Sequence, residues 1–599
     1  MAADTIPHRL FAQARTRPGQ PAYFTRAPSG TWTPTDWATY AAQVRRAARA
    51  LITLGVPERG SVCILGFNRP EWVIIDVATM AIRAAPAGIY TTSSPPEVQY
   101  IIHHAESTVV VVENLAQYKK VQAERDKGNL PQLQWIVLMA GAEKPAGDAM
   151  ALSWEEFNAK ADATPESELD RRTAAIGKHE HATFIYTSGT TGPPKAVMLS
   201  MENLTWTADC ARGLVQVTPD DASLSYLPLS HIAEQMFTLH VPITVGFPVY
   251  FCESIERVVD NLKEVKPTVM FGVPRIWEKM YSGVAQKAAA ATGAKKAIMG
   301  FARATGTEWH ATLNAGRTPG ALLKVRYAIA NKLVFSKVKA ALGFDRIRVC
   351  VSGAAPISKE IIEFFSGFDI MIREVYGQSE DTGPTSFNVP GKSRIGSVGP
   401  ALPGVEVKIA ADEEILVKGP NVFLGYYKDE AATNETLVDG WLHSGDLGKF
   451  DADGHLWITG RKKEIIITAG GKNIAPKNIE GSLRNHELIS QAVVIGDRRK
   501  FLSAVLTLSP EAAKTFAAAN GIPVAGIHLH PKLLAAVQKV VDDVNKEYAQ
   551  VEWIRKFTVL ENDFTIDGGE FTPTLKIKRK VVAQKYAKEI EAMYEGAGE

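Results

Sequence analysis

The first third of the chain alternates strand-like and helix-like segments, and this alternation constrains the fold more than any other feature. Apolar residues recur at helical spacing over 35–54, and a strand-like run follows at 62–67. A second helix is expected over 68–80, and further strand-like runs occupy 86–90 and 109–112. Strands separated by helices predict a parallel sheet that is covered on both faces. We therefore expect an α/β fold with parallel sheets.

The length and composition indicate a large protein without a global charge preference. A chain of 599 residues is too long for one hydrophobic core, which predicts several structural units. Its residues are 46% hydrophobic and 22% charged, as in ordinary soluble proteins. The formal net charge of +2 gives no general attraction to nucleic acid, so we expect no nucleic-acid partner.

The cysteines and the apolar runs bear on the cellular compartment. Cys63, Cys210, Cys252 and Cys350 lie far apart, without the paired spacing of zinc or redox sites, and are typical of buried positions in a reducing compartment. Residues 1–30 contain no apolar stretch of a secretory signal. The longest apolar runs are far shorter than the about 20 residues that span a bilayer. We expect a cytoplasmic protein, soluble or peripheral to a membrane, and leave its oligomeric state open.

A loop rich in glycine and hydroxyl groups interrupts the strand-like run at 184–200. Gly189 and Gly192 let the backbone approach an anion closely, and Lys195 adds a mobile positive charge. The spacing is not that of a Walker A loop, because two residues instead of four separate the glycines. The pattern predicts phosphate binding, and an ordinary turn between two strands is the alternative.

Three further strand-like runs end in residues that suit a nucleotide or its acceptor. One leads into Ser352–Pro356, whose small side chains allow a flat ring to lie against the backbone. Another leads into Tyr376–Glu380, and the carboxylate of Glu380 suits Mg²⁺ beside phosphates. The third leads to His231, where α/β sheets place ligands, although a helix-start or core histidine is the alternative.

The chain changes character in its second half. Short strands with glycine and proline turns predict a β-rich subdomain over about 391–461. Within it, Asp446 suits the hydroxyl groups of a sugar and Arg461 suits the same sugar or a phosphate, with a turn aspartate and a surface arginine as the alternatives. Residues 462–599 contain enough helices and strands for an α+β domain. We expect a large domain over 1–461 and a small one over 462–599.

The segment 279–346 is strongly basic. It contains twelve Lys or Arg residues and two acids, with apolar residues between them. A basic amphipathic segment suits an anionic membrane surface, so peripheral membrane contact is one hypothesis. A solvated helix face is the alternative.

Five stretches occur together in the order and near the spacing of one enzyme family. They are 186–200, 352–356, 376–380, 444–446 and 460–464. They resemble the AMP-forming adenylating superfamily, which includes acyl-CoA synthetases, luciferases and the adenylation domains of peptide synthetases, and the likeness extends over about 35–590. Three further stretches, 66–72, 88–94 and 572–579, look like those of long-chain and bubblegum-type fatty acyl-CoA synthetases.

The resemblance implies roles for the candidate residues. Thr187 and Glu380 would hold Mg²⁺, Lys576 would be the adenylation lysine, and His231 would stand between the acyl and CoA channels. The hinge of a mobile C-terminal domain would be Lys463. The contacts with ATP and CoA would come from Ser188, Gly189, Thr190, Thr191, Gly192 and Lys195 at the phosphates, from Gly353, Ala354, Ala355, Pro356, Tyr376 and Gly377 at adenine, from Ser379, Asp446 and Arg461 elsewhere on the nucleotide, and from Gly470 and Gly471 at pantetheine.

The implied reaction has two steps. A fatty-acid carboxylate attacks the α-phosphorus of ATP and pyrophosphate leaves, while Mg²⁺ and Lys576 stabilise the negative charge on oxygen. The thiol of CoA then displaces AMP after the small domain rotates about Lys463.

The sequence departs from the family pattern at two points. Ala196 stands where the family commonly has Gly, and no Ser-Gly pair precedes the last lysine, so Lys578 is an alternative to Lys576. The following Ile-x-Arg favours Lys576. An aryl or medium-chain substrate, a carrier-protein acceptor and a catalytically silent acyl-binding or uptake protein are the alternative functions.

Overall fold

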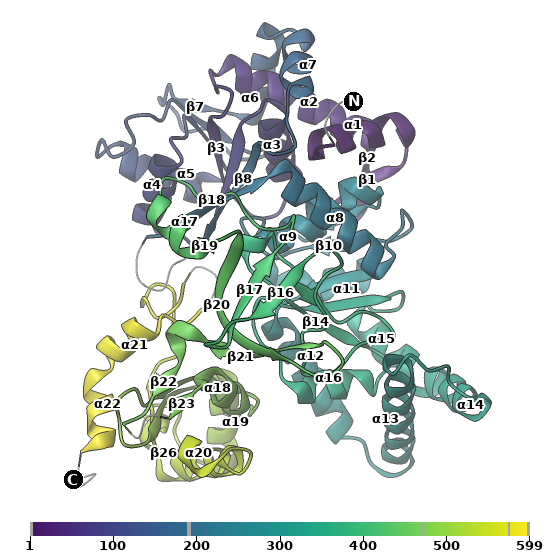
Figure 1. Ribbon diagram of the computed structural model, residues 1–599, viewed down its shortest axis with the longest axis vertical. Helices are drawn as coiled ribbons and strands as arrows, with labels where there is room; N and C mark the ends of the chain where they lie inside the picture. Colours follow the sequence, from purple (N-terminus) through teal and green to yellow (C-terminus); the bar gives the residue numbers. More distant parts are fainter. Residues whose placement is uncertain (1–3, 188–192, 470–471, 573–575, 596–599) are drawn as a thin grey trace.

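The computed structural model describes residues 4–187, 193–469, 472–572 and 576–595 (Figure 1). Its largest sheet has the order β18-β9-β8-β4-β3-β5-β6-β7, in which β8 and the strands after it are parallel and β9 and β18 are antiparallel to their neighbours. The strands are β3 (Ser61–Leu65), β4 (Ala85–Ile89), β5 (Val109–Val112), β6 (Trp135–Leu138), β7 (Ala151–Leu152), β8 (His181–Thr187), β9 (Lys195–Ser200) and β18 (Gly425–Tyr426).

Helices cover both faces of this sheet. The four valines of β5 are fully buried, and alternate ones point to opposite faces. Val109 and Val111 share a core with α2 (Trp37–Thr53) and α3 (Pro70–Ala81). The other two share a core with α4 (Pro95–His104) and α5 (Leu115–Arg125). The predicted α/β fold with a covered parallel sheet is confirmed.

A second sheet brings two predicted strand ends together. Its strands β12, β13 and β14 are parallel, and β15 pairs antiparallel with β14. Ser352 faces Glu374 across the ladder, so the residues that follow β13 lie beside those that follow β14. These strands are β12 (Val269–Gly272), β13 (Val349–Ser352), β14 (Ile372–Tyr376) and β15 (Ser386–Phe387); a neighbouring sheet contains β1 (Pro21–Arg26), β2 (Trp32–Asp36), β10 (Ser223–Ser225) and β11 (Val249–Phe251).

The predicted β-rich subdomain is an antiparallel sheet. In it, β20 pairs with β17, β19 and β21, and β16 pairs with β17. The strands are β16 (Glu406–Ile409), β17 (Glu414–Lys418), β19 (Leu437–Val438), β20 (Trp441–Phe450) and β21 (Leu456–Arg461). The remaining helices of this larger part of the chain include α7 (Glu166–Ala174), α8 (Met201–Val215), α9 (Ile232–Gln235), α10 (Val241–Val245), α11 (Val258–Val265), α12 (Pro274–Ala289), α13 (Gly293–Asn314), α14 (Ala321–Ala330), α15 (Ser336–Leu342), α16 (Lys359–Ser366) and α17 (Glu430–Thr436).

The C-terminal part has apolar cores of its own and lies at the lower left of Figure 1. Its elements are β22 (Ile466–Ile467), β23 (Asn473–Ile474), α18 (Pro476–Arg484), β24 (Ile489–Ile495), β25 (Leu502–Leu508), α19 (Pro510–Asn520), α20 (Pro531–Asn545), β26 (Ile554–Val559), α21 (Arg579–Lys585) and α22 (Ala587–Tyr594). The last helical stretch is divided at Tyr586 into α21 and α22, and the Tyr586 hydroxyl donates to Glu570 Oε1 at 2.8 Å.

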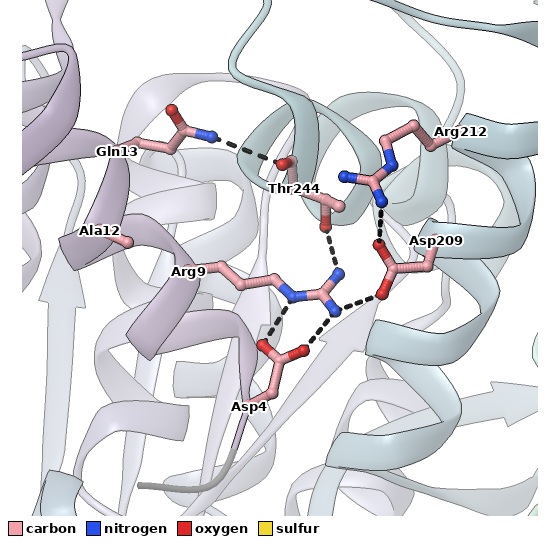
Figure 2. Close-up of a pocket in the computed structure, with 7 residues that line it drawn as sticks. All are labelled: Asp4, Arg9, Ala12, Gln13, Asp209, Arg212 and Thr244. Carbon is pink, nitrogen blue, oxygen red and sulfur yellow. Dashed lines mark hydrogen bonds and ion pairs between the residues drawn. The ribbon is translucent and has the colours of Figure 1, made fainter. Parts of the chain in front are cut away.

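An arginine clasp fixes the N-terminal helix α1 (Ile6–Thr16) to the body of the protein (Figure 2). The Arg9 guanidinium donates to Thr244 Oγ1 at 2.8 Å and pairs with Asp4 at 2.6 Å and Asp209 at 2.5 Å. Beside it, Gln13 donates to the Ile243 carbonyl at 3.0 Å. The small pocket around this clasp shares no residue with the candidate nucleotide site, so we interpret it as structural.

The hydropathy of the helices and the state of the cysteines bear on the expected cellular compartment. Within the described ranges, no helix combines the length and hydropathy needed to cross a membrane. Three of the four cysteines are buried and Cys210 is half-buried, and all four carry free thiols.

Replacing Arg9 by Met should destabilise the protein. The substitution removes hydrogen bonds to two carboxylates and a hydroxyl from a side chain that is only 13% exposed, at a cost of about 1–2 kcal/mol. Urea denaturation measures the change in the free energy of unfolding. Arg212→Met is the matched control, since Arg212 is 55% exposed and reaches Asp209 only at 3.6 Å. Equal losses of unfolding free energy in both variants would contradict a stabilising role of the Arg9 contacts.

Candidate active site

Asp446 links two sheets at the centre of the candidate site. The Tyr376 hydroxyl, at the end of β14, donates to Asp446 Oδ2 at 3.0 Å. Arg461 faces Asp446 across the β20–β21 ladder, and its Nε lies 3.3 Å from Oδ1. The structure therefore brings together three residues that the sequence had predicted as nucleotide contacts from three separate stretches.

The backbone after β13 lies open beside Tyr376. Gly353 is buried, and a Cβ atom there would stand 2.5 Å from the Val375 side chain. Ala354 has a φ of +66°, and Ala354, Ala355 and Pro356 are exposed. The arrangement offers a surface with few side chains next to an aromatic ring.

Gly377 is required by a close backbone approach. A Cβ atom at this position would lie 1.6 Å from the Gly383 carbonyl oxygen, which leaves no room for any side chain. The turn that follows contains buried Ser379 and is closed by Asp381, whose carboxylate accepts the Gln378 N–H at 2.8 Å and the Thr385 hydroxyl. Burial raises the pKa of Asp381 to about 8. The sequence reading missed Asp381, although its position three residues after Gln378 matches a capping pattern.

Tyr426 joins two predicted phosphate-side residues and was also missed. Its hydroxyl donates to Glu380 Oε1 at 2.7 Å, and the Lys195 ammonium lies 4.7 Å from the centre of its ring. Lys195 also lies 3.7 Å from Asp429, and its carbonyl accepts the Thr187 hydroxyl at 3.4 Å. Ser188, Gly189, Thr190, Thr191 and Gly192, between these two strands, lie outside the described residues, as do Gly470 and Gly471.

Lys576 from the C-terminal part faces this site. Burial and the positive charges of Arg461 and Lys477 lower the pKa of Lys576, and the carboxylates of Glu380 and Asp446 oppose the shift. Lys576 is nevertheless exposed to solvent. Its segment is fixed by the Thr572 N–H, which donates to the Lys576 carbonyl at 2.8 Å.

His231 begins α9, as its alternative interpretation predicted. Its Nδ1 accepts the Ala233 N–H at 3.2 Å, which caps the helix. Burial and the charge of Lys576 lower the pKa of His231 to about 4. His231 caps α9 and also lies near Lys576. Its interpretation as a helix-start residue is therefore compatible with its interpretation as a site residue.

The predicted hinge lies in a single 3₁₀ turn between β21 and β22. This turn spans Lys462–Glu464, and Lys463 is exposed within it. Lys462 pairs with Asp412 at 2.6 Å and with Glu414 at 3.1 Å, which holds the first half of the turn on the large part. Lys477 pairs with Glu464 at 2.9 Å on the other side.

A divalent cation at this site would need ligands from a nucleotide as well as from the protein. Within the described residues, no group of three or more His, Cys, Asp or Glu side chains is arranged to hold a metal ion. Glu380 and Thr187 nevertheless provide a carboxylate and a hydroxyl on the phosphate side, and Mg²⁺ is usually held by one or two carboxylates together with substrate phosphates. These oxygen donors fit such an ion when a nucleotide supplies the remaining ligands.

Comparisons with known proteins define the class. Residues 10–427 match the family model "AMP-binding enzyme", and residues 463–598 match "AMP-binding enzyme C-terminal domain". The chain therefore belongs to the AMP-binding enzyme family.

Individual relatives are similar to the chain over most of its length. The chain is 40% identical over 600 residues to the long-chain-fatty-acid–CoA ligase FadD15 of Mycobacterium bovis, covering 99% of this chain and 97% of the relative. It is 38% identical over 596 residues to the human long-chain-fatty-acid–CoA ligase ACSBG2, covering 94% and 88%. The adenylation domain of a carboxylic acid reductase from Segniliparus rugosus, solved with AMP, superposes with a TM-score of 0.74 at 19% identity, covering 99% and 94%. This likeness confirms the fold class.

Replacing Gly377 by Ala should disturb the turn at the end of β14. The added methyl group collides with the Gly383 carbonyl, and the forced backbone shift should cost about 1–3 kcal/mol and displace Tyr376. Urea denaturation and nucleotide binding measure the two effects. Gly283→Ala on α12 is the control, because a Cβ there meets no atom within 4 Å. A Gly377→Ala variant with unchanged stability would contradict the expected collision with the Gly383 carbonyl.

Protonation of His231 should reduce the stability of the folded protein as the pH falls. Because the folded protein holds the pKa of His231 near 4, the unfolded chain binds the proton more readily between pH 6.5 and 4. Stability is therefore lost as pH decreases through this window. His231→Asn keeps a capping acceptor but cannot titrate, so its thermal midpoint should decrease less than that of the wild type between pH 7 and 5. Parallel decreases would be the contrary result.

Proposed function

We propose that this enzyme is a long-chain fatty acid–CoA ligase, which converts ATP, a fatty acid and CoA into acyl-CoA, AMP and pyrophosphate through an acyl-adenylate. The names of its 40% and 38% identical relatives support the substrate class. The observation that supports the proposal is that Lys576, from the C-terminal part, lies near enough to Glu380, Asp446 and Arg461 for their charges to act on it. A cation placed opposite nucleotide-binding groups suits a reaction that builds negative charge on phosphorus-bound oxygens.

The nucleotide would lie along the edge formed by β13, β14 and β20. Adenine would lie between the open backbone of Gly353–Pro356 and the Tyr376 ring. Asp446, oriented by Tyr376 and Arg461, would accept hydrogen bonds from the ribose hydroxyls. Ser379 would contact the nucleotide near the α-phosphate, and Lys195 and the 188–192 loop would bind the other phosphates.

Glu380 and Thr187 would hold Mg²⁺ beside the phosphates. The bound ion supplies positive charge that offsets the charge of the triphosphate. Tyr426 orients the Glu380 carboxylate through the 2.7 Å hydrogen bond, so the residue presents its second oxygen in a fixed direction.

The first half-reaction would place the fatty-acid carboxylate in line with the α-phosphorus. Its oxygen forms the new P–O bond as the bond to pyrophosphate breaks. Lys576, in its protonated form, would donate a hydrogen bond to the oxygens that gain charge. Because the pKa of Lys576 is lowered, this donor would be lost on raising the pH sooner than for an ordinary lysine.

The second half-reaction would need a different arrangement of the two parts. Lys576 would leave the site by rotation about Lys463, and the CoA thiol would attack the acyl carbonyl and release AMP. His231 borders the space that Lys576 occupies, in keeping with a position between the acyl and thiol channels. The 3₁₀ turn that contains Lys463 is short enough to concentrate the rotation in a few dihedral angles.

One specific observation keeps an aryl acid as the second candidate substrate. An anthranilate CoA ligase superposes on the chain with a TM-score of 0.72 at 20% identity. Release of pyrophosphate with C8 to C24 fatty acids and with benzoate-type acids, each with and without CoA, separates these candidates. Turnover of long chains supports the proposal. Turnover of aryl acids alone, CoA-independent transfer to a carrier protein, or no turnover at all overturns it. Separately from the catalytic assignment, we propose a cytoplasmic location with peripheral membrane contact, which these turnover assays do not test.

The lysine assignment is tested by two alanine substitutions. Lys576→Ala should reduce acyl-adenylate formation, followed by ATP–pyrophosphate exchange, by about 10²–10³-fold. It should leave the transfer of a preformed acyl-adenylate to CoA nearly unchanged. Lys578→Ala is the matched control, because Lys578 precedes α21 and its N–H donates to the Glu570 carbonyl at 2.7 Å. A larger loss from Lys578→Ala than from Lys576→Ala would reverse the assignment.

A further inference from the structure

The helical segment 321–342, formed by α14, a π-helical turn over Asn331–Phe335 and α15, exposes an apolar stripe. In Figure 1, α14 projects at the lower right of the molecule. The stripe consists of Leu322, Val325, Ile329 and Leu333, which are 74%, 57%, 46% and 41% exposed. Side chains three or four residues apart lie on one helix face, so these four form a continuous surface.

The opposite face of the same helix is anchored. Leu323, Ala330 and Phe335 are buried in the core. Tyr327 stacks on Trp309 of α13 with ring centres 4.1 Å apart, and its hydroxyl donates to Asp369 at 2.7 Å. The helix is therefore held in place by one face while the apolar stripe points outward.

Three exposed lysines lie on the same helical segment as the stripe. Lys324, Lys332 and Lys337 are exposed and form no ion pair within the described residues. Two other basic residues of the segment are used internally, because Arg326 pairs with Glu308 at 2.7 Å and Lys339 pairs with Asp369. No acidic residue occurs between 321 and 344. The exposed side chains of this segment therefore include apolar and positively charged ones and no acidic one.

We propose that this face binds the surface of an anionic phospholipid bilayer. The four apolar side chains would enter the boundary between headgroups and acyl chains, and the three lysines would lie against the lipid phosphates. A second copy of the chain is the less suitable occupant, because pairing of this face with itself would set lysines against lysines. The reason for docking rests on the proposed function, since long-chain fatty acids partition into bilayers.

Vesicle flotation of the full-length protein tests this surface. The wild type should float with phosphatidylcholine vesicles that contain phosphatidylglycerol, and not with phosphatidylcholine alone. Lys324→Gln, Lys332→Gln and Lys337→Gln should each lower the partition coefficient about fivefold. The combined Leu322→Ser, Val325→Ser, Ile329→Ser and Leu333→Ser variant should lower it about tenfold or more. High salt should weaken binding of the wild type.

Matched controls come from the C-terminal part of the chain. Val524, Leu529 and Val551 are 48%, 69% and 46% exposed, and their replacement by Ser should leave flotation unchanged. Lys514→Gln and Lys539→Gln, on exposed positions, control for net charge. Thermal midpoints equal to that of the wild type show that the variants are folded.

The proposal is overturned if the 321–342 substitutions do not change flotation, or if the control variants lose flotation equally. It is also overturned if binding does not depend on phosphatidylglycerol. A change in oligomeric state in the absence of vesicles, when the apolar stripe is replaced, would likewise contradict it. Flotation measures binding without turnover. Loss of the ligase activity would therefore contradict the proposed function and leave this surface standing, and loss of flotation would do the reverse.

Discussion

The arrangement of the candidate site depends on one carboxylate, that of Asp446. Its two oxygens are used separately: one accepts the Tyr376 hydroxyl and the other faces the Arg461 guanidinium. Tyr376 belongs to the parallel sheet and Arg461 to the antiparallel one, so the carboxylate sets the position of the two sheets relative to each other. It also offsets the repulsion that Arg461 and Lys477 exert on Lys576. A neutral side chain at this position would remove one of the carboxylates that balance Arg461 and Lys576, and would leave Glu380 and Glu464 to do so.

Much of the fold is predictable from the sequence because local and tertiary preferences agree. The valines of β5 are β-branched and occupy a strand that is buried on both faces, so their run has one stable conformation. The ends of β13 and β14 were predicted with their site residues, because small or aromatic residues follow each strand directly. The division between α21 and α22 at Tyr586 was not predictable, because no glycine or proline marks it in the sequence.

The site residues that sequence reasoning missed are those whose role comes from distant pairing. Tyr426 lies in β18, a strand of two residues that pairs with β9 more than two hundred positions earlier in the chain. No periodic pattern marks so short a strand. The stripe on 321–342 was missed for a related reason. Its composition shows that the helix is basic and apolar, but only the packing of Leu323, Ala330 and Phe335 decides which apolar residues remain outside.

The separate cores of the C-terminal part have a further consequence. Among the described residues, its two apolar clusters contain no side chain from the larger part of the chain. The contacts that cross between the parts include polar ones, such as Arg275 to the Ser490 carbonyl at 3.0 Å and Asn485 to the Ser358 hydroxyl at 3.1 Å. Water replaces such partners at little net cost. The rotation proposed above would therefore leave both apolar clusters intact, and a substrate that binds one orientation more tightly would shift the population toward it.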